Sequence, residues 1–182
     1  MTSSDSAADL AEFDTALRDG RSVHVRAVSP ADEAELLQTF ARMDEHARYM
    51  RFMRVVREPD LERLRSVLVS FPASGIGIVA TVPASDGIDI VGSAIAVIGS
   101  DDRSRCEFAI SVTAAYGGTG LATTLMNTLI GAATRRGLKE MEGFVLSENR
   151  PMLRLARRLG FSVAYDPDDP SVRVCRLPLG AA

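Results

Sequence analysis

The chain contains few of the residues that build metal centres and disulfide frameworks. Its 182 residues include two cysteines, two histidines and no tryptophan. Because these cysteines and histidines are scattered along the chain, we expect no metal site. Cys106 and Cys175 both lie in apolar, strand-like runs. We therefore expect two buried free thiols rather than a disulfide.

Long apolar runs and an excess of basic charge are also absent. No apolar run approaches the roughly 20 residues that a membrane helix needs, and the N-terminus lacks the basic-then-apolar pattern of a secretion signal. The 21 Lys and Arg residues and 24 Asp and Glu residues give a net charge of -3, which argues against general nucleic-acid binding. We expect a cytoplasmic protein without membrane or nucleic-acid partners.

The length of the chain is enough for one domain with a sizeable core. The first residues are small and polar, which is typical of a loose tail. Leu10, Phe13 and Leu17 follow at helical spacing and predict a short helix. We therefore place a tail and a short helix in residues 1–20 and the folded domain in residues 21–182.

Helical and strand-like patterns alternate through the rest of the chain. Ser29 and Pro30 predict a helix start, with Asp32 completing a capping box. We expect helices at about 30–43, 44–54, 59–71, 120–136 and 149–159. We expect strands at about 22–27, 75–82, 88–98, 103–112, 140–146, 161–165 and 171–179. Short turns predict an antiparallel meander in the middle, and a helical connection predicts that strand 140–146 is parallel to strand 103–112. The fold class is α+β with a mixed central sheet.

Three glycines lie where strand 103–112 passes into helix 120–136. Gly117, Gly118 and Gly120 permit positive φ angles and a close approach to the backbone. The helix that follows begins with unpartnered N–H groups and the positive end of its dipole. A strand, a glycine turn and a helix N-terminus together predict a phosphate-binding site.

Other interpretations of the glycine turn fit less well. A P-loop requires Lys followed by Ser or Thr after the last glycine, and Leu121 and Ala122 stand there. A dinucleotide-binding fingerprint fits two of the glycines, but Thr123 occupies the third glycine position and the chain has one strand-helix-strand unit. A plain structural turn is the remaining alternative, although three glycines in four residues are costly in chain entropy.

With two later motifs, the glycine turn resembles the GNAT-type, acetyl-CoA-dependent N-acetyltransferases. The signature Gln/Arg-x-x-Gly-x-Gly/Ala aligns with residues 117–122, and the family's later Asn and Gly-Phe pair correspond to Asn149 and to Gly160 with Phe161. The resemblance covers residues 23–179. It implies a mixed central sheet flanked by helices on both faces, with acetyl-CoA as co-substrate and no metal.

Three segments resemble one branch of this family more narrowly. Residues 26–32, 48–52 and 106–112 look like the bacterial protein-lysine acetyltransferases often called Pat. That resemblance implies a lysine on a folded protein as acceptor, with an acyl-CoA synthetase as the leading candidate. A small-molecule amine acetyltransferase and a CoA-sensing module without turnover remain as alternatives.

The resemblance to the GNAT family also implies roles for individual residues. The backbone at the end of strand 103–112 would pair with the pantetheine arm, the amides of the glycine turn would hold the pyrophosphate, and Asn149 would contact the arm near the thioester. The residues implied for acetyl-CoA binding are Ile110, Ser111, Val112, Gly117, Gly118, Thr119, Gly120, Leu121, Ala122, Thr123, Asn149 and Arg158. A solvated cation is the alternative for Arg158.

The sequence departs from the family pattern at two positions. Gly117 replaces the usual Gln or Arg, so one side-chain contact to the cofactor is missing. Ala156 stands where many members carry a Tyr that protonates the leaving thiolate. The proton donor for that step is therefore left open.

Glu107 is the candidate catalytic base. Because a lysine amine has a pKa of about 10.4, it is protonated at neutral pH and a base helps to make it nucleophilic. Strand alternation places Glu107 with Ala109 and Ser111, opposite the apolar face of the strand. The Pat-like resemblance places the base at the same residue. The alternative is a strand-edge glutamate paired with Arg103 or Arg105.

A row of arginines is the candidate contact for the acceptor. Arg48, Arg51 and Arg54 are spaced by three residues in the predicted helix 44–54, so neighbours in the row face similar directions. Such a row would suit an acidic patch around a target lysine. A solvated charged face is the alternative interpretation.

Overall fold

The structure, a computed structural model, describes residues 10–180. The predicted tail falls almost entirely outside that range. The strands are β1 (Phe13–Ala16), β2 (Ser22–Ala27), β3 (Gly75–Ala84), β4 (Gly87–Ile98), β5 (Arg105–Val112), β6 (Glu140–Leu146), β7 (Ser162–Tyr165) and β8 (Val172–Pro178). The helices are α1 (Glu33–Arg42), α2 (Glu45–Phe52), α3 (Leu61–Ser70), α4 (Leu121–Arg135) and α5 (Arg150–Arg158), with 3-10 turns η1 (Pro30–Asp32) and η2 (Ala114–Tyr116).

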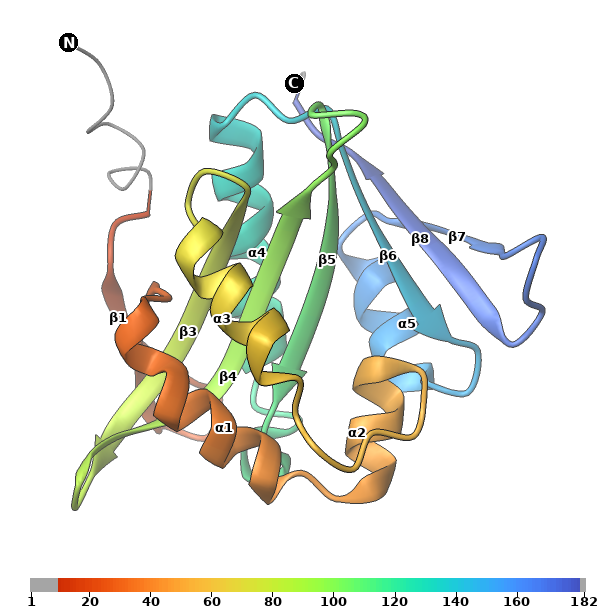
Figure 1. Cartoon of the computed structure of the whole chain (residues 1–182). Helices are drawn as coiled ribbons and strands as arrows, with labels where there is room; N and C mark the ends of the chain where they lie inside the picture. The colour runs from red at the N-terminus through yellow and green to blue at the C-terminus, as the bar shows by residue number, and fades with distance from the viewer. Residues whose placement is uncertain (1–9, 181–182) are drawn as a thin grey trace, which may run out of the picture.

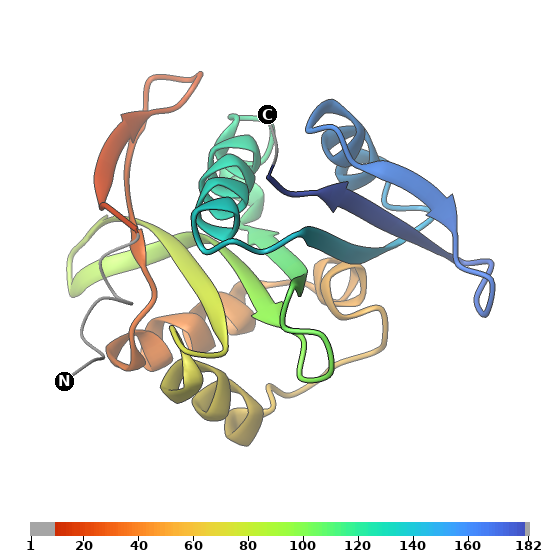
Figure 2. The same cartoon turned by 90° about the horizontal axis from the view of Figure 1, so that it is seen from above.

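The eight strands form one mixed sheet in the order β1-β2-β3-β4-β5-β6-β8-β7. Strands β5 and β6 are parallel, as the helical connection between them predicts, and the other neighbours are antiparallel. Helices α1, α2 and α3 cover one face of the sheet, and α4 and α5 cover the other (Figures 1 and 2). The predicted α+β fold, with helices on both faces, is confirmed.

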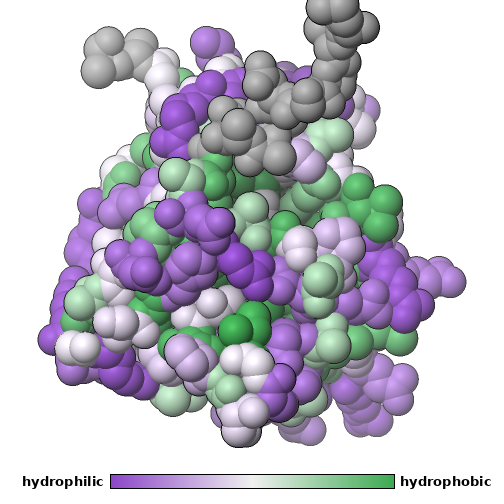
Figure 3. All heavy atoms as spheres, turned by 90° about the vertical axis from the view of Figure 1, so that its left-hand side faces the viewer, coloured by the Kyte–Doolittle hydropathy of each residue, from purple (hydrophilic) through white to green (hydrophobic). Residues whose placement is uncertain are grey.

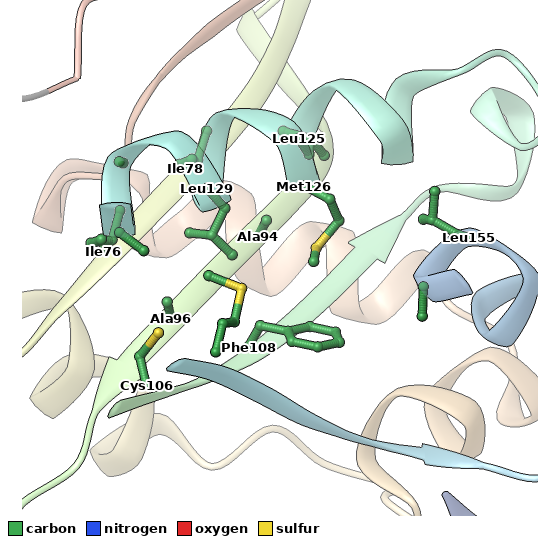
Figure 4. Close-up of a cluster of buried hydrophobic side chains, with 14 of the residues drawn as sticks. Ile76, Ile78, Ala94, Ala96, Cys106, Phe108, Leu125, Met126, Leu129 and Leu155 are labelled. Atoms are coloured by element: carbon green, nitrogen blue, oxygen red, sulfur yellow. The ribbon is translucent and has the colours of Figure 1, made fainter. Parts of the chain in front are cut away.

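The main core lies between α4 and the centre of the sheet. Leu121, Leu125 and Leu129 recur every four residues, so they lie on one face of α4, and all three are buried. Figure 4 shows this face over Ala94 of β4 and Phe108 of β5. Each such fully buried side chain stabilises the fold by about 1.5 to 3 kcal/mol. The face of β5 that carries Phe108 is therefore buried in the core against α4.

The short helix predicted near the N-terminus is wrong, because Phe13–Ala16 form the edge strand β1. The unpaired edge of β2 offers backbone partners that a short isolated helix would lack. His24 of β2 also joins its two ring nitrogens to Asp14 and Glu12, at 2.8 and 2.9 Å. Figure 3 shows the face on the β1 side, where hydrophilic residues are spread among smaller hydrophobic areas.

The predicted helix start after β2 is confirmed. The Asp32 carboxylate accepts the Ser29 backbone N–H at 2.8 Å and two guanidinium N–H groups of Arg26 at 2.7 and 2.8 Å. This nearly buried ion pair ties the end of β2 to the first helical turn, which is η1 before α1 begins. Segment 26–32 therefore has a structural role.

Both cysteines are buried and unpaired, as predicted. The described part of the chain contains no helix with the length and apolar character needed to cross a membrane.

Candidate active site

A gap in the sheet lies between β5 and β6. The two strands pair over only three positions, from Arg105 with Glu140 to Glu107 with Glu142, and then diverge (Figure 1). On its other edge, β5 stays paired with β4 as far as Val112. Beyond Glu107, the β6-facing edge of β5 therefore presents backbone groups without a strand partner. An extended ligand can pair with such an edge.

The glycine turn closes the end of this gap. After β5 the chain passes through η2 and enters α4 by way of Gly118 and Gly120, whose φ angles are 72° and 91°. These are left-handed conformations, which glycine adopts without the penalty that a Cβ brings. Gly120 is the N-cap residue of α4 and brings no side chain to the helix start. The backbone amides of the turn are therefore left accessible.

Five amides at the turn have no acceptor within residues 10–180. They belong to Gly118, Thr119, Gly120, Ala122 and Thr123. The next amide, that of Leu121, reaches only the Thr119 hydroxyl oxygen at 3.4 Å. The 15-residue α4 adds the positive end of its dipole at the same place. Free donors at a helix N-terminus form a favourable site for phosphate groups.

The β1–β2 hairpin holds the turn from one side. Arg18 donates its backbone N–H to the Thr119 carbonyl at 3.1 Å, and Arg21 donates a guanidinium N–H to the Ala115 carbonyl at 2.7 Å. The Arg18 side chain is exposed, and its Nε lies 3.3 Å from where a Cβ on Gly120 would be. It forms no hydrogen bond or ion pair with the described residues. A free guanidinium therefore lies beside the free amides.

The sequence does not single out Arg18, because about 100 residues separate it from the glycine turn and only the sheet pairing of β1 brings them together. The basic residues on either side of the Asp19-Gly20 turn were the only signal available.

Glu107 lies where the pairing of β5 and β6 ends, on the face opposite Phe108. Its carboxylate forms no hydrogen bond or ion pair in the part of the chain that the structure describes. The alternative partners are engaged elsewhere, because Arg105 pairs with Glu140 at 2.9 Å and Arg103 donates to a backbone carbonyl. Pairing of Glu107 with either arginine is therefore wrong.

The surroundings of Glu107 favour its neutral form. Partial desolvation raises the pKa of the Glu107 carboxyl even though the residue is exposed to solvent, and the negative charge of Glu142 raises it further. The positive charges of Arg63 and Arg51 act in the opposite direction and lower this pKa. The balance is a carboxyl group with a raised pKa, which is the shift that makes a glutamate a better proton acceptor.

The three arginines predicted to form a row do not make one continuous cationic surface, so that prediction is wrong. Arg48 donates to two backbone carbonyls at the end of α1. Burial lowers the pKa of Arg51 to about 10, and the Arg51 charge interacts with Glu107 and Arg63. Arg54 lies beyond α2, which ends at a left-handed Met53 with φ of 56°. The three side chains therefore have different environments.

The other residues singled out from the sequence belong to the β6–α5 unit. Asn149 caps α5, because its Oδ1 accepts the Met152 backbone N–H at 3.3 Å. Its side-chain NH₂ group is left for another partner. Ala156 is fully buried in the core. Arg158 is exposed in the last turn of α5, and its side chain forms no hydrogen bond or ion pair with residues 10–180.

Comparison with known proteins places this geometry in a family. The model of the acetyltransferase (GNAT) domain matches residues 22–162. Acetyltransferase PA5475 of Pseudomonas aeruginosa is 29% identical over 163 residues, which are 90% of this chain and 87% of that protein.

Solved structures share the fold at lower identity. The GNAT domain of PAT from S. lividans has a TM-score of 0.82 and 20% identity, covering 92% of this chain and 97% of that chain. YncA from Salmonella typhimurium, a putative acetyltransferase solved with its cofactor acetyl-CoA, has a TM-score of 0.66 and 21% identity, with coverages of 88% and 95%. A cAMP-binding acyltransferase from Mycobacterium smegmatis has a TM-score of 0.62 and 23% identity, but this chain spans only 49% of its length.

The family match includes the strand gap, Glu107, the glycine turn and α5. The likeness to the solved structures agrees with it at the level of the fold. This chain therefore belongs to the GNAT acetyltransferase domain family and is an acyltransferase.

Proposed function

We propose that this enzyme transfers an acetyl group from acetyl-CoA to a primary amine, with Glu107 as the general base. One observation carries the proposal: an unpartnered carboxylate with a raised pKa lies where the gap between β5 and β6 opens. The free amides of the glycine turn lie at the other end of the same strand. The five residue-to-residue steps of extended chain from Glu107 to Val112 correspond to about 17 Å.

Acetyl-CoA would lie along this strand. The unpaired edge at Ile110, Ser111 and Val112 supports pairing with the pantetheine arm, and the free amides support pyrophosphate binding. Gly117 contributes no side chain there, and we assign the missing cationic contact to Arg18. In the β6–α5 unit, the free NH₂ group of Asn149 is available to the pantetheine arm. Arg158 is a second exposed cation, after Arg18, that is available to acetyl-CoA.

The reaction needs a neutral amine and a leaving thiolate. Glu107 takes a proton from the acceptor ammonium, and the amine nitrogen then attacks the thioester carbonyl carbon. As the new carbon–nitrogen bond forms, the carbon–sulfur bond breaks and CoA leaves as a thiolate, while the nitrogen releases its second proton to water. Because Ala156 carries no acidic hydrogen on its side chain, we assign the later protonation of sulfur to water.

For the acceptor we propose a lysine on a folded protein, with an acyl-CoA synthetase as the candidate. The support is the resemblance of segments 48–52 and 106–112 to the Pat enzymes. Because Arg48 is bound to backbone carbonyls, an arginine row that contacts an acidic patch around the target lysine no longer supports this acceptor. An acidic residue, Glu142, also lies beside Glu107, and Arg176 contacts the Glu142 carboxylate at 3.2 Å.

A specific observation favours a second candidate, a small amine that also carries a carboxylate. Arg51 and Arg63 lie close enough to Glu107 to influence its pKa. Guanidinium groups bind carboxylates well, so these two residues could orient an acceptor with its amine toward Glu107. Such an acceptor would be much smaller than a protein.

Competition between acceptors tests the proposal. A folded synthetase, the same synthetase heat-unfolded, amino acids and simple amines would be offered with labelled acetyl-CoA at matched amine concentration, followed by mass mapping of lysines. A protein acceptor predicts modification of one lysine in the folded synthetase alone. Faster turnover on amino acids, with KM raised about tenfold or more by Arg63→Gln, would establish the second candidate. Binding of acetyl-CoA without turnover on any acceptor would indicate a sensor.

A further inference from the structure

Helix α5 lies beside the β7–β8 pair at one end of the sheet (Figures 1 and 2). Side chains from these elements line a separate concave region. It has a volume of about 440 Å³. We call it the arginine groove. Its lining includes Arg150, Arg154, Arg157, Arg173, Leu153 and Tyr165. The lining shares no residue with the strand gap, the glycine turn or the surroundings of Glu107.

One face of α5 supplies three of the arginines. Arg150, Arg154 and Arg157 are spaced at i, i+4 and i+7, so they lie within an arc of about 60° and along about 10 Å of helix axis. All three are exposed, and none of their guanidinium groups forms a hydrogen bond or ion pair with residues 10–180. Like charges at this spacing destabilise a helix. The arrangement is therefore unfavourable unless an anion compensates it.

The fourth arginine is held in place on the opposite wall. Arg173 donates to the carbonyls of Pro170 and Val172 at 2.9 and 3.1 Å. Its guanidinium carbon lies 3.8 Å from the centre of the Tyr165 ring. Tyr165 is itself 72% exposed. The groove thus has one fixed cation, with an exposed aromatic ring beside it.

No acidic residue within the described range lines the groove. The nearby β7–β8 loop is acidic: Asp166 accepts the Asp168 backbone N–H, Asp169 accepts the amide and hydroxyl of Ser171, and the Asp168 carboxylate has no such contact among the described residues. The whole chain has a net charge of -3. The cluster of cations is therefore a local feature and does not follow from overall composition.

We propose that the arginine groove binds an acidic segment of a protein partner in an extended conformation. Carboxylates on alternate residues of an extended segment lie about 7 Å apart, which matches the separation of about 6 Å between Arg150 and Arg154 along the helix axis. Each guanidinium can hold a carboxylate through two hydrogen bonds.

Two other anionic ligands fit the groove less well. The cations extend along about 10 Å of helix, so they do not converge on one phosphate-sized anion. The negative net charge of the chain opposes the long phosphate backbone of a nucleic acid. An acidic peptide needs only a few charges in a line, and it is the ligand that the groove favours.

Fluorescence anisotropy with a labelled eight-residue peptide of alternating Glu and Ser tests the proposal on the full chain. The double variant Arg154→Ser/Arg157→Ser is expected to raise Kd at least tenfold. The control Arg103→Ser/Lys139→Ser removes the same two charges elsewhere and is expected to change Kd less than twofold. A third variant, Arg154→Lys/Arg157→Lys, keeps the charges and the helix, and is expected to bind with intermediate affinity because paired hydrogen bonds are lost.

Three results would overturn the proposal: the peptide does not bind at low salt, the control variant loses as much peptide affinity as the Arg154→Ser/Arg157→Ser variant, or an equimolar amount of inorganic phosphate displaces the peptide. Tighter binding of an eight-nucleotide thymidine strand through the same arginines would assign the groove to nucleic acid instead. If the serine variant does not fold, the lysine variant provides the test. Peptide affinity equal to that of the parent protein would then contradict recognition by guanidinium groups.

Discussion

Glu107 and Glu142 lie opposite each other at the last position where β5 and β6 are paired. The Glu142 carboxylate contacts the Arg176 guanidinium at 3.2 Å, whereas Glu107 has no such partner among the described residues. The charge of Glu142 therefore adds to partial desolvation in raising the pKa of Glu107. The position where the sheet opens is also the position of the proposed base.

Arg63→Gln is expected to move the acidic limb of the pH–rate profile to higher pH. Of the two arginines that lower the pKa of Glu107, Arg63 has the larger effect, so its removal raises that pKa further. Because the base must be deprotonated, the rate is lost as pH falls through the Glu107 pKa. Arg65→Gln is the matched control, since Arg65 lies on the same helix but pairs with Glu33 at 2.8 Å. An identical profile for parent and Arg63→Gln would contradict this assignment.

Gly120→Ala is expected to weaken acetyl-CoA binding about tenfold or more, which corresponds to about 1.4 kcal/mol. A Cβ there would lie 3.3 Å from Arg18 Nε, in a backbone conformation with φ of 91°. Gly137→Ala is the control, because Gly137 has φ of 76° and open space around its Cβ position. Both variants should lose about 1 to 2 kcal/mol of stability from the positive φ. Calorimetric titration should find the affinity loss only for Gly120→Ala; equal affinities would place the phosphate site elsewhere.

Arg18→Ala is expected to weaken acetyl-CoA binding by about tenfold, as the loss of a charge-assisted hydrogen bond worth about 1.5 kcal/mol implies. Acetyl-pantetheine lacks the pyrophosphate, so its binding should be the same for parent and variant. Arg42→Ala removes an equal charge from a surface ion pair with Asp89 and should leave both affinities unchanged. Equal losses for the two ligands would show that Arg18 acts on the fold of the turn rather than on phosphate.

Asp32→Ala is expected to lower the free energy of unfolding by about 3 to 5 kcal/mol, because it leaves the partly buried Arg26 without its partner. Burial alone would raise the pKa of Asp32, but hydrogen bonds from Arg26 and Ser29 lower it overall. Its stabilising effect is therefore present above the usual value of 3.8 and is lost as pH falls below it. Asp89→Ala, in the exposed pair with Arg42, should cost at most about 1 kcal/mol in denaturant unfolding. Similar losses for the two variants would contradict the account.

Most of the fold could be predicted because local patterns agree with it. The strands predicted at 22–27 and 140–146 appear as β2 and β6 without change, and the capping box at Ser29 and Asp32 is present. Alternation also placed Glu107 and Phe108 correctly on opposite faces of β5. These features depend on neighbouring residues, which is the information that a single sequence carries.

The incorrect predictions concern features that depend on contacts between residues far apart in the sequence. Phe13–Ala16 is a strand because the edge of β2 is available, although its apolar residues fall at helical spacing. The arginine row fails because Met53 ends α2 early and the carbonyls at the end of α1 engage Arg48. Arg18 reaches the glycine turn only through the β1–β2 hairpin. None of these contacts has a local signature in the sequence.

The pH dependence of acetyl transfer by Glu107→Gln tests the central claim most directly. Glutamine keeps the shape of the side chain and removes its basicity, so acetyl-CoA affinity should be unchanged while kcat falls about 100-fold or more. The acidic limb of the parent profile should lie above the ordinary glutamate value of 4.5, because the pKa of Glu107 is raised, and it should disappear in the variant. A variant that retains the parent's rate and the parent's acidic limb would contradict the account.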